Sequence, residues 1–147
     1  MIRLERSITI ARPIEAVFAY VTDMNKVKSW LPVRDIRALS PGVIGVGSTY
    51  AQTAVFMGRE FASTIEVTQY QPTRLFAFKM IQGPFPLSNT MTLAPTPGGG
   101  TILTIIGEAE PGSALSFIGP FVTPIVKKQM ETQVNQLKQA IETTVGR

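Results

Sequence analysis

Hydrophobic and polar residues alternate along most of this chain, and one stretch near its end changes to a helical spacing. The first run, Ile2 to Ile10, places Leu4, Ile8 and Ile10 on one face, which is the period of a half-buried β-strand. Six more runs of this kind follow: Val33 to Ser40, Ser48 to Phe56, Arg59 to Tyr70, Leu75 to Ile81, Leu87 to Leu93 and Thr101 to Glu110. Their short connections, rich in Gly and Pro, predict antiparallel strands that meander as neighbours.

Three stretches have helical character. Pro13 suits the first turn of a short helix. A second short helix carries Val27 and Trp30 and ends before Pro32, because the residue before a proline avoids the helical region. The last helix is long, and its apolar residues recur at steps of three or four along one stripe: Val126, Met130, Val134, Leu137, Ile141 and Val145.

This order of elements predicts an α+β fold in which a curved antiparallel sheet of about seven strands wraps around the long C-terminal helix. Two short helices follow the first strand. The 147 residues show no change of composition, so we expect one domain over residues 1–147. A sheet that grips a helix in this way encloses a cavity.

The segment before the long helix has a character of its own. The triplet Pro111-Gly112-Ser113 breaks the chain and offers Ser113 as a helix N-cap. The strongly apolar run from 115 to 122 follows, with Pro120 and Pro124 near the start of the helix. We expect an irregular first part and a regular helix from about Ile125. A mobile lid is the favoured interpretation; a packed helix start and contact with a membrane surface are the alternatives.

The chain has no cysteine and no histidine. Disulfides, thiolate nucleophiles, Ser-His-Asp triads and zinc sites with nitrogen or sulfur ligands are therefore excluded. Carboxylate, Lys, Arg, Tyr, hydroxyl and amide groups are what is left for chemistry. We expect no metal and no cofactor, and the sequence identifies no catalytic residue.

The net charge of +4 comes from 14 Lys and Arg against 10 Asp and Glu, and no basic run is longer than Lys127-Lys128. This spacing is typical of a solvated surface, so nucleic acid is not expected as a partner. No signal peptide pattern and no apolar run long enough for a membrane span are visible. We therefore expect a cytoplasmic protein without stable membrane insertion, either a monomer or a homodimer.

Several short motifs, in this order, resemble the START/Bet v 1-like (SRPBCC) superfamily in its polyketide cyclase/dehydrase-like branch. They cover nearly the whole chain: the residues 10–18, Asp23, Trp30-Leu31-Pro32, Gly45-Val46-Gly47-Ser48, the residues 66–72, and Gly100-Thr101. The resemblance implies a helix-grip fold with an internal cavity for a lipid, a polyketide or another apolar molecule. It does not imply a single activity.

Strand alternation identifies the side chains that face the concave side of the sheet, and these are candidate ligand contacts. They are Tyr50, Gln52, Phe56, Phe61, Ile65, Phe78, Met80, Asn89, Met91, Leu103 and Ile105. The same alternation turns Ser63 inward. Trp30 is expected at the cavity or its mouth, and the resemblance implies that the segment with Phe121 and Ile125 covers the mouth. Taken singly, each aromatic or Met residue is more often plain core.

Polar residues decide between the possible functions. Gln52 and Asn89, if turned inward, need partners from water or from a ligand head group. Binding of a small hydrophobic molecule is the favoured hypothesis. The first alternative is a cyclase or dehydratase that uses Tyr50, Gln52, Asn89 and Arg6 without a histidine base; the second is an interaction subunit with a filled cavity.

Other charged residues admit two interpretations. Arg34 and Arg37 lie near the expected mouth and either clamp an anion or, as is more common, pair with a surface acid. Glu108 and Glu110 share one strand face, and a solvated outer pair is favoured over paired catalytic carboxylates.

Overall fold

A seven-stranded antiparallel sheet and a long helix make up the fold of the computed structural model, which describes residues 2–31, 33–56, 58–83, 87–109 and 119–144. The strands are β1 (Ile2–Ile10), β2 (Val33–Ala38), β3 (Thr49–Phe56), β4 (Arg59–Gln71), β5 (Leu75–Gln82), β6 (Leu87–Pro95) and β7 (Thr101–Ala109). Their order in the sheet is β1-β7-β6-β5-β4-β3-β2. The predicted helix-grip fold is confirmed, and the strand ends agree with the alternation pattern to within two residues.

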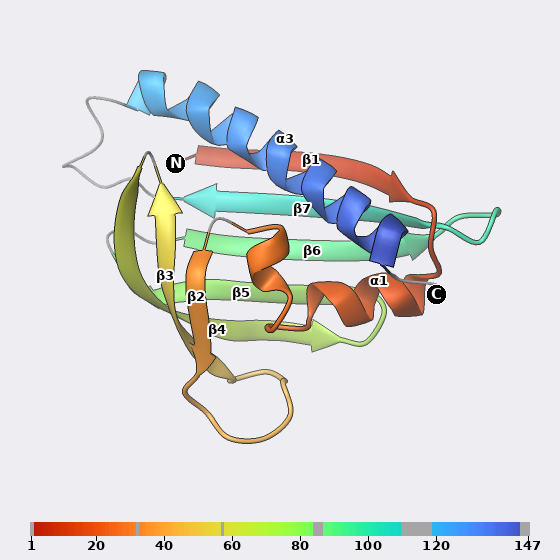
Figure 1. Cartoon of the computed structure of the whole chain (residues 1–147), viewed down its shortest axis with the longest axis horizontal. Helices are drawn as coiled ribbons and strands as arrows, with labels where there is room; N and C mark the ends of the chain where they lie inside the picture. Colours follow the sequence, from red (N-terminus) through yellow and green to blue (C-terminus); the bar gives the residue numbers. More distant parts are fainter. Residues whose placement is uncertain (1, 32, 57, 84–86, 110–118, 145–147) are drawn as a thin grey trace.

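The helices are α1 (Ile14–Val21), a single 3-10 turn η1 (Val27–Ser29) and α3 (Gly119–Thr144). Figure 1 shows α3 lying across β1 and β7, with α1 in front of the lower strands of the sheet. Pro13 precedes α1 with extended backbone angles, and Glu15 lies in the first turn, where the helix dipole favours a negative charge.

The second predicted short helix is wrong in extent, because only one 3-10 turn forms there. The Asp23 carboxylate accepts a hydrogen bond from the Asn25 amide at 3.0 Å, which is the local bonding that competes with helix formation. Pro32 then restricts the residue before it. Trp30 therefore follows the turn instead of lying within a helix.

The long helix also begins earlier than predicted, at Gly119 instead of about Ile125. Pro120 falls in the first turn, where a missing N–H costs no intrahelical bond. Pro124 forfeits one bond, and the helix continues through it. Residues 110–118 lie outside the described residues, and with them the expected N-cap at Ser113 and the first half of the apolar run 115–122 in which a lid was expected.

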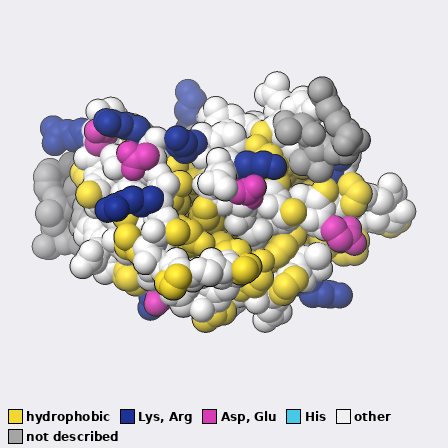
Figure 2. Space-filling view, turned by 60° about the horizontal axis from the view of Figure 1, so that its bottom comes forward, with side chains coloured by type: hydrophobic (Ala, Val, Ile, Leu, Met, Phe, Trp, Pro, Cys, Tyr) yellow, Lys and Arg dark blue, Asp and Glu magenta, His cyan; other side chains and the backbone are white. Residues whose placement is uncertain are grey.

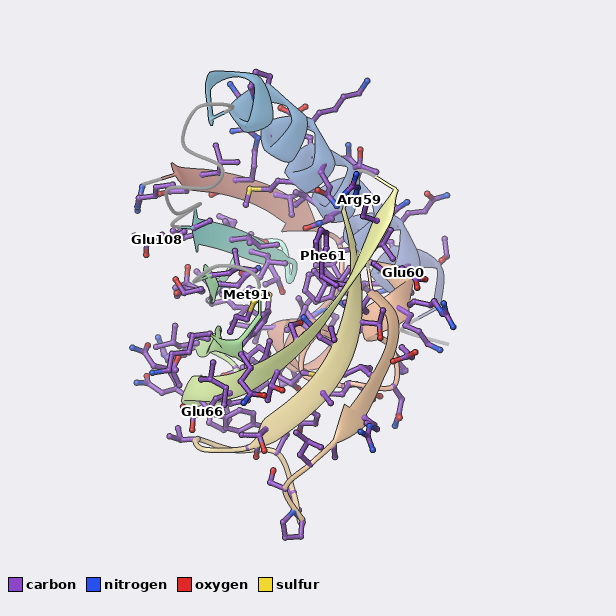
Figure 3. The ribbon with its side chains drawn as sticks, turned by 90° about the vertical axis from the view of Figure 1, so that its left-hand side faces the viewer. Arg59, Glu60, Phe61, Glu66, Met91 and Glu108 are labelled. Atoms are coloured by element: carbon purple, nitrogen blue, oxygen red, sulfur yellow. The ribbon has the colours of Figure 1, made fainter. Side chains whose placement is uncertain are left out.

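Irregular pairing bends the sheet. The register between β4 and β5 shifts between Thr64 and Ile65 and again between Val67 and Gln69, and the register between β2 and β3 shifts between Val33 and Asp35. Such bulges add bend and twist to a strand. Figures 1 and 3 show that the part of the sheet made by β2, β3 and the start of β4 curves away from the remaining strands.

The predicted apolar stripe of α3 forms a large part of the core. Met130 and Val134 are 8% and 4% exposed, and Leu137 and Ile141 are fully buried. Gly107 on β7 leaves room for this helix, because a Cβ atom added there would lie 3.1 Å from Cε of Met130. The side chains of Val126 and Val145 lie outside the described set.

Polar contacts fasten α3 to β1 beside this stripe. The Arg6 guanidinium donates to Glu131 at 2.7 Å, and Lys138 Nζ donates to the Thr9 carbonyl at 2.5 Å. Glu142 accepts from Lys138 and from the Ala11 amide, each at 2.8 Å. Glu131, Lys138 and Glu142 thus clamp the helix to the first strand and the residue that follows it.

We predict that Leu137→Ala lowers the free energy of unfolding by about 2 to 5 kcal/mol, because truncating a buried leucine loses its transfer energy and leaves a cavity. Urea unfolding measures the change. Gln136→Ala, at the exposed neighbouring position, is the control and is expected to change stability by less than about 0.5 kcal/mol. Equal losses in both variants would contradict the orientation of α3.

We predict a pH-dependent contribution from Glu142. The hydrogen bond from Lys138, and then that from the Ala11 amide, lower the pKa of the Glu142 carboxyl in the folded state. Its stabilisation is therefore complete above the ordinary carboxyl pKa and is lost as the pH falls through the lower, folded-state pKa. Glu142→Gln is expected to be less stable than the wild type at neutral pH, with the difference shrinking on acidification.

Urea unfolding from neutral to acidic pH measures this difference. Glu108→Gln is the matched control, since Glu108 forms no ion pair with any described residue. A gap between wild type and Glu142→Gln that widens on acidification would contradict the assignment.

Candidate functional site

The concave face of the sheet is the candidate site, and the alternation of side chains positions it. In β4, Ser63, Ile65 and Val67 are buried, whereas Glu60 and Thr68 on the opposite face are exposed. In β7, Leu103 and Ile105 are buried and Ile102 is 40% exposed. The predicted inward faces of these two strands are therefore confirmed. In Figure 3, Phe61 and Met91 point toward the interior from strands on different sides.

The predicted site residues fall into three groups. Seven are buried: Trp30, Tyr50, Ile65, Phe78, Met91, Leu103 and Ile105. Four others are partly exposed: Gln52, Phe61, Met80 and Asn89. The side chains of Phe56, Phe121 and Ile125 lie outside the described set, so the structure does not place them. The described members come together on one apolar wall with two amides in it.

A small void lies in this wall beside Trp30. Its volume is about 10 Å³, which is close to the space that one water molecule needs. Ten residues line it: Val21, Met24, Val27, Trp30, Leu31, Ile36, Gln52, Ile65, Phe76 and Phe78. All ten side chains are uncharged. In this state the wall around Trp30 is closed, and a larger guest requires side chains to move.

Several methionines around the core are suited to such movement. Met91 and Met130 are buried, and Met24 packs against the core at its edge. Met80 lies against Gly83, where a Cβ atom would come within 2.1 Å of the Met80 sulfur. Methionine has three rotatable bonds and repacks more easily than branched side chains. The wall can therefore change its shape without a change of fold.

Three buried polar atoms in this interior have no hydrogen-bond partner among the described residues: Nε1 of Trp30, Oγ of Ser63 and Oδ1 of Asn89. Ser63 lies directly opposite Gln52 in the β3–β4 register. Asn89 lies opposite Phe78 on β5 and Gly107 on β7. Since buried polar groups in proteins are nearly always paired, each of these atoms calls for an explanation.

Tyr50 is the titratable group of the predicted set. Burial raises the pKa of its phenol, which a hydrogen bond with Ser48 partly opposes and the neighbouring Tyr70 reinforces. The phenol is therefore protonated at neutral pH and acts as a hydrogen-bond donor or acceptor. A general base at neutral pH needs a pKa near 7, and this shift moves Tyr50 away from that range.

The arginines considered as anion clamps are engaged elsewhere. Arg6 binds Glu131 on α3 at 2.7 Å, and Arg34 binds both carboxylate oxygens of Glu60, at 2.7 and 3.0 Å. Arg37 is exposed on the outer face of β2. Of the two interpretations given for Arg34, pairing with an acid is the one that the structure shows, and Arg6 is paired with an acid as well. The Glu108–Glu110 pair is not placed, because Glu110 lies outside the described residues.

A larger hollow of about 270 Å³ lies on the opposite, convex side of β2, β3 and β4. Its floor includes Ala51 and Ala62, and Asp35, Arg37 and Thr64 stand around it. These residues have the outward register, so the hollow is a surface groove over small side chains. Gln52 and Ser63, which have the inward register, also border it from the strands that form its floor. Its size alone would favour this hollow as the ligand site, but it lacks the enclosed apolar walls that are typical of a ligand pocket.

Apolar side chains are also found on the surface. Leu39, Val43, Val46 and Ile81 are between 45% and 91% exposed. Figure 2 shows hydrophobic side chains across the middle of the face that it presents, with Lys and Arg around them. Within the described ranges, no helix is long and apolar enough to cross a membrane, and no cluster of acidic side chains is arranged to hold a metal ion.

Sequence reasoning missed part of the wall. Val21 and Met24 come from α1 and the turn after it, and Ile36 comes from the edge strand β2. Helical spacing marks Val21 as an inward residue, but it does not show which strand the helix covers. Ser63 was placed inward but was not counted as a site residue, because a serine in an apolar strand face gives no signal of its own.

Comparison with known proteins supports this fold over the whole chain. A protein from Thermus thermophilus has a TM-score of 0.82 at 17% identity and covers 99% of this chain and 100% of its own. A START superfamily protein from Mycobacterium smegmatis has a TM-score of 0.82 at 17% identity, with 96% and 97% covered. The Zhui aromatase/cyclase from a Streptomyces species has a TM-score of 0.75 at 15% identity, with 98% and 95% covered.

These identities show a shared fold and carry no activity with them. No match is found among curated proteins. Residues 1–142 match the family model described as polyketide cyclase / dehydrase and lipid transport. This match, together with the helix-grip fold and the apolar concave wall, confirms the resemblance. The chain belongs to the polyketide cyclase/dehydrase and lipid transport family, and it has START-like structural neighbours.

Proposed function

We propose that this protein binds a small hydrophobic molecule between the concave face of the sheet and α3. The observation that carries the proposal is the set of buried polar atoms without partners, Trp30 Nε1, Ser63 Oγ and Asn89 Oδ1, in an otherwise apolar interior. Apolar walls with a few convergent polar groups are the usual design of a small-molecule site.

The side chains around these atoms support the proposal. Phe76 and Phe78 pack with tilted rings at 5.9 Å between ring centroids, and Tyr70 meets Phe76 edge to face at 6.1 Å. This wall offers a large apolar contact area to a guest. Membership in a family whose description includes lipid transport points in the same direction.

Entry of a guest requires the interior to open, since the void beside Trp30 measures only about 10 Å³. The methionines described above provide adaptable packing for this step. The contacts that these methionines lose on opening are offset by the contacts and the hydrogen bonds that the guest makes. A closed empty state and an open loaded state are therefore both part of the proposal.

A cyclase or dehydratase activity gains no support from the described geometry. Burial raises the pKa of the Tyr50 phenol, so this side chain is not a base at neutral pH. Arg6, the cation of that hypothesis, is bound to Glu131. An interaction subunit is the remaining alternative, and the ligand experiments below distinguish it from a binding protein.

We predict that binding changes the fluorescence of Trp30, the only tryptophan in the chain. Trp30 is 1% exposed and borders the interior void, so a guest that enters there changes its surroundings. Titration with a long-chain alcohol or with Nile red measures the shift. Native mass spectrometry of the purified protein provides the second readout, with a co-purified lipid-like mass as the expected result. Unchanged fluorescence and mass would favour the interaction subunit.

We predict that Ser63→Ala raises the free energy of unfolding of the ligand-free protein by about 1 kcal/mol, because it removes a buried hydroxyl that has no partner. Urea unfolding measures this effect. Thr101→Val is the matched control. Thr101 is fully buried, and its hydroxyl donates to the Arg12 carbonyl at 2.8 Å, so this change is expected to cost about 1 to 3 kcal/mol. A comparable loss for Ser63→Ala would contradict the assignment.

A further inference from the structure

We infer that the interior selects neutral, oxygen-bearing apolar molecules, such as long-chain ketones and alcohols, over molecules that carry a carboxylate. The inference rests on the proposed function and names the class of ligand for the same site. The polar groups of Trp30, Gln52 and Ser63, together with the absence of charged side chains from the void that Trp30 and Gln52 border, carry the argument.

Trp30 and Gln52 come from separate elements and meet at one void, and Ser63 lies beside Gln52 on the neighbouring strand. Gln52 lies directly opposite Ser63 between β3 and β4, and side chains opposite each other in an antiparallel pair lie about 5 Å apart at Cβ. The indole nitrogen and the amide thus share one void in an apolar wall, and the hydroxyl lies next to the amide; these three groups are the polar corner.

The chemistry of this corner defines the atom that it can bind. The Trp30 indole N–H only donates, so it requires an acceptor. The Ser63 hydroxyl either donates or accepts, and the Gln52 amide does both. An oxygen atom of a ketone, ester or alcohol satisfies Trp30 and leaves Ser63 and Gln52 free to complete the bonding.

The surroundings of the corner disfavour a charged head group. None of the ten described residues that line the void is Lys or Arg. Arg34 on the neighbouring strand is bound to Glu60, and Arg6 on the far edge of the sheet is bound to Glu131. Arg37 is exposed on the outer face of β2 and lines the outer hollow, not the void beside Trp30. A carboxylate placed here would lose its hydration without gaining a cation, which costs far more than burying a neutral oxygen.

Asn89 supports the same preference from a second point in the interior. Its Oδ1 atom is buried without a partner, and an amide oxygen only accepts hydrogen bonds. An ionised carboxylate has no proton to donate and would repel this oxygen. A hydroxyl group of a ligand can donate to it.

Four matched twelve-carbon probes test the inference: dodecan-2-one, dodecan-1-ol, dodecanoate and dodecane. Displacement of the neutral dye Nile red measures their affinity at neutral pH. We expect the ketone and the alcohol to bind at least about tenfold more tightly than dodecanoate. Dodecanoate that binds as tightly as the alcohol, or more tightly, would overturn the inference and leave the proposed function intact. Failure of Nile red and of all four probes to bind would remove the proposed function and the inference with it.

Two variants test the polar corner itself. Trp30→Phe keeps an aromatic ring but removes the N–H, and Ser63→Ala removes only the hydroxyl, so a folding defect in the first does not affect the second. Each is expected to weaken the ketone about two- to tenfold, the range for one neutral hydrogen bond, and to leave dodecane unchanged. Equal effects on ketone and dodecane in both variants would mark the corner as structural and overturn the inference.

Thr53→Val is the control for these variants. Thr53 follows Gln52 on β3 and faces the outer groove. Its replacement is expected to leave the affinity for all four probes unchanged. A loss of ketone binding in this control, equal to that in Ser63→Ala, would show that the effect does not come from the interior and would also overturn the inference.

Discussion

Burial of one apolar stripe of α3 against the concave sheet is the interaction on which the rest of the structure depends. Leu137 and Ile141 are fully buried, and Met130 and Val134 nearly so. Burial of such side chains is worth about 1.5 to 3 kcal/mol each. The polar contacts of Glu131, Lys138 and Glu142 fix the rotation and the height of the helix on β1. The stripe thus stabilises the packing of α3 on the sheet, while these clamps provide its position.

The bend of the sheet follows from the same constraint. A flat sheet under a single helix would leave half of its inner face exposed to water. The register shifts in β2 and β4 turn the far strands toward the helix side, and α1 with η1 covers the gap between them. Trp30 lies fully buried where these parts meet. The bent sheet, α1 and η1 therefore close the interior together.

Much of this architecture was predictable from the period of the sequence. Alternation in β4 and β7 identified Ile65, Val67, Leu103 and Ile105 as inward residues, because a one-residue shift would turn every one of them to solvent. Helical spacing identified the stripe of α3, because residues three or four positions apart lie on the same face of a helix. Local sequence signals predicted the extent of helices less well. Side-chain bonding competes with helix formation at the single turn η1, and prolines near the start of α3 did not prevent the helix from beginning at Gly119.

The candidate site was less predictable than the fold. Inward orientation follows from strand period, so Gln52 and Asn89 were expected on the concave face. Whether a buried polar atom has a partner depends on neighbours from other strands, which the sequence does not reveal. The roles of Arg6 and Lys138 could not be predicted for the same reason, since their partners Glu131 and Thr9 lie more than a hundred residues away in the chain.

Stability and binding make opposite demands on this interior. Each buried polar atom without a partner costs about 1 to 3 kcal/mol, a sizeable part of the 5 to 15 kcal/mol that holds a typical domain folded. A water molecule in the void beside Trp30 would satisfy the indole, but neither Ser63 nor Asn89 borders that void. Apolar residues at these two positions would remove the cost and keep the wall intact. Ser63 also borders the outer hollow, whereas Asn89 borders neither hollow nor void, so the Asn89 side chain in particular is better explained by a guest that binds it than by the packing of the empty protein.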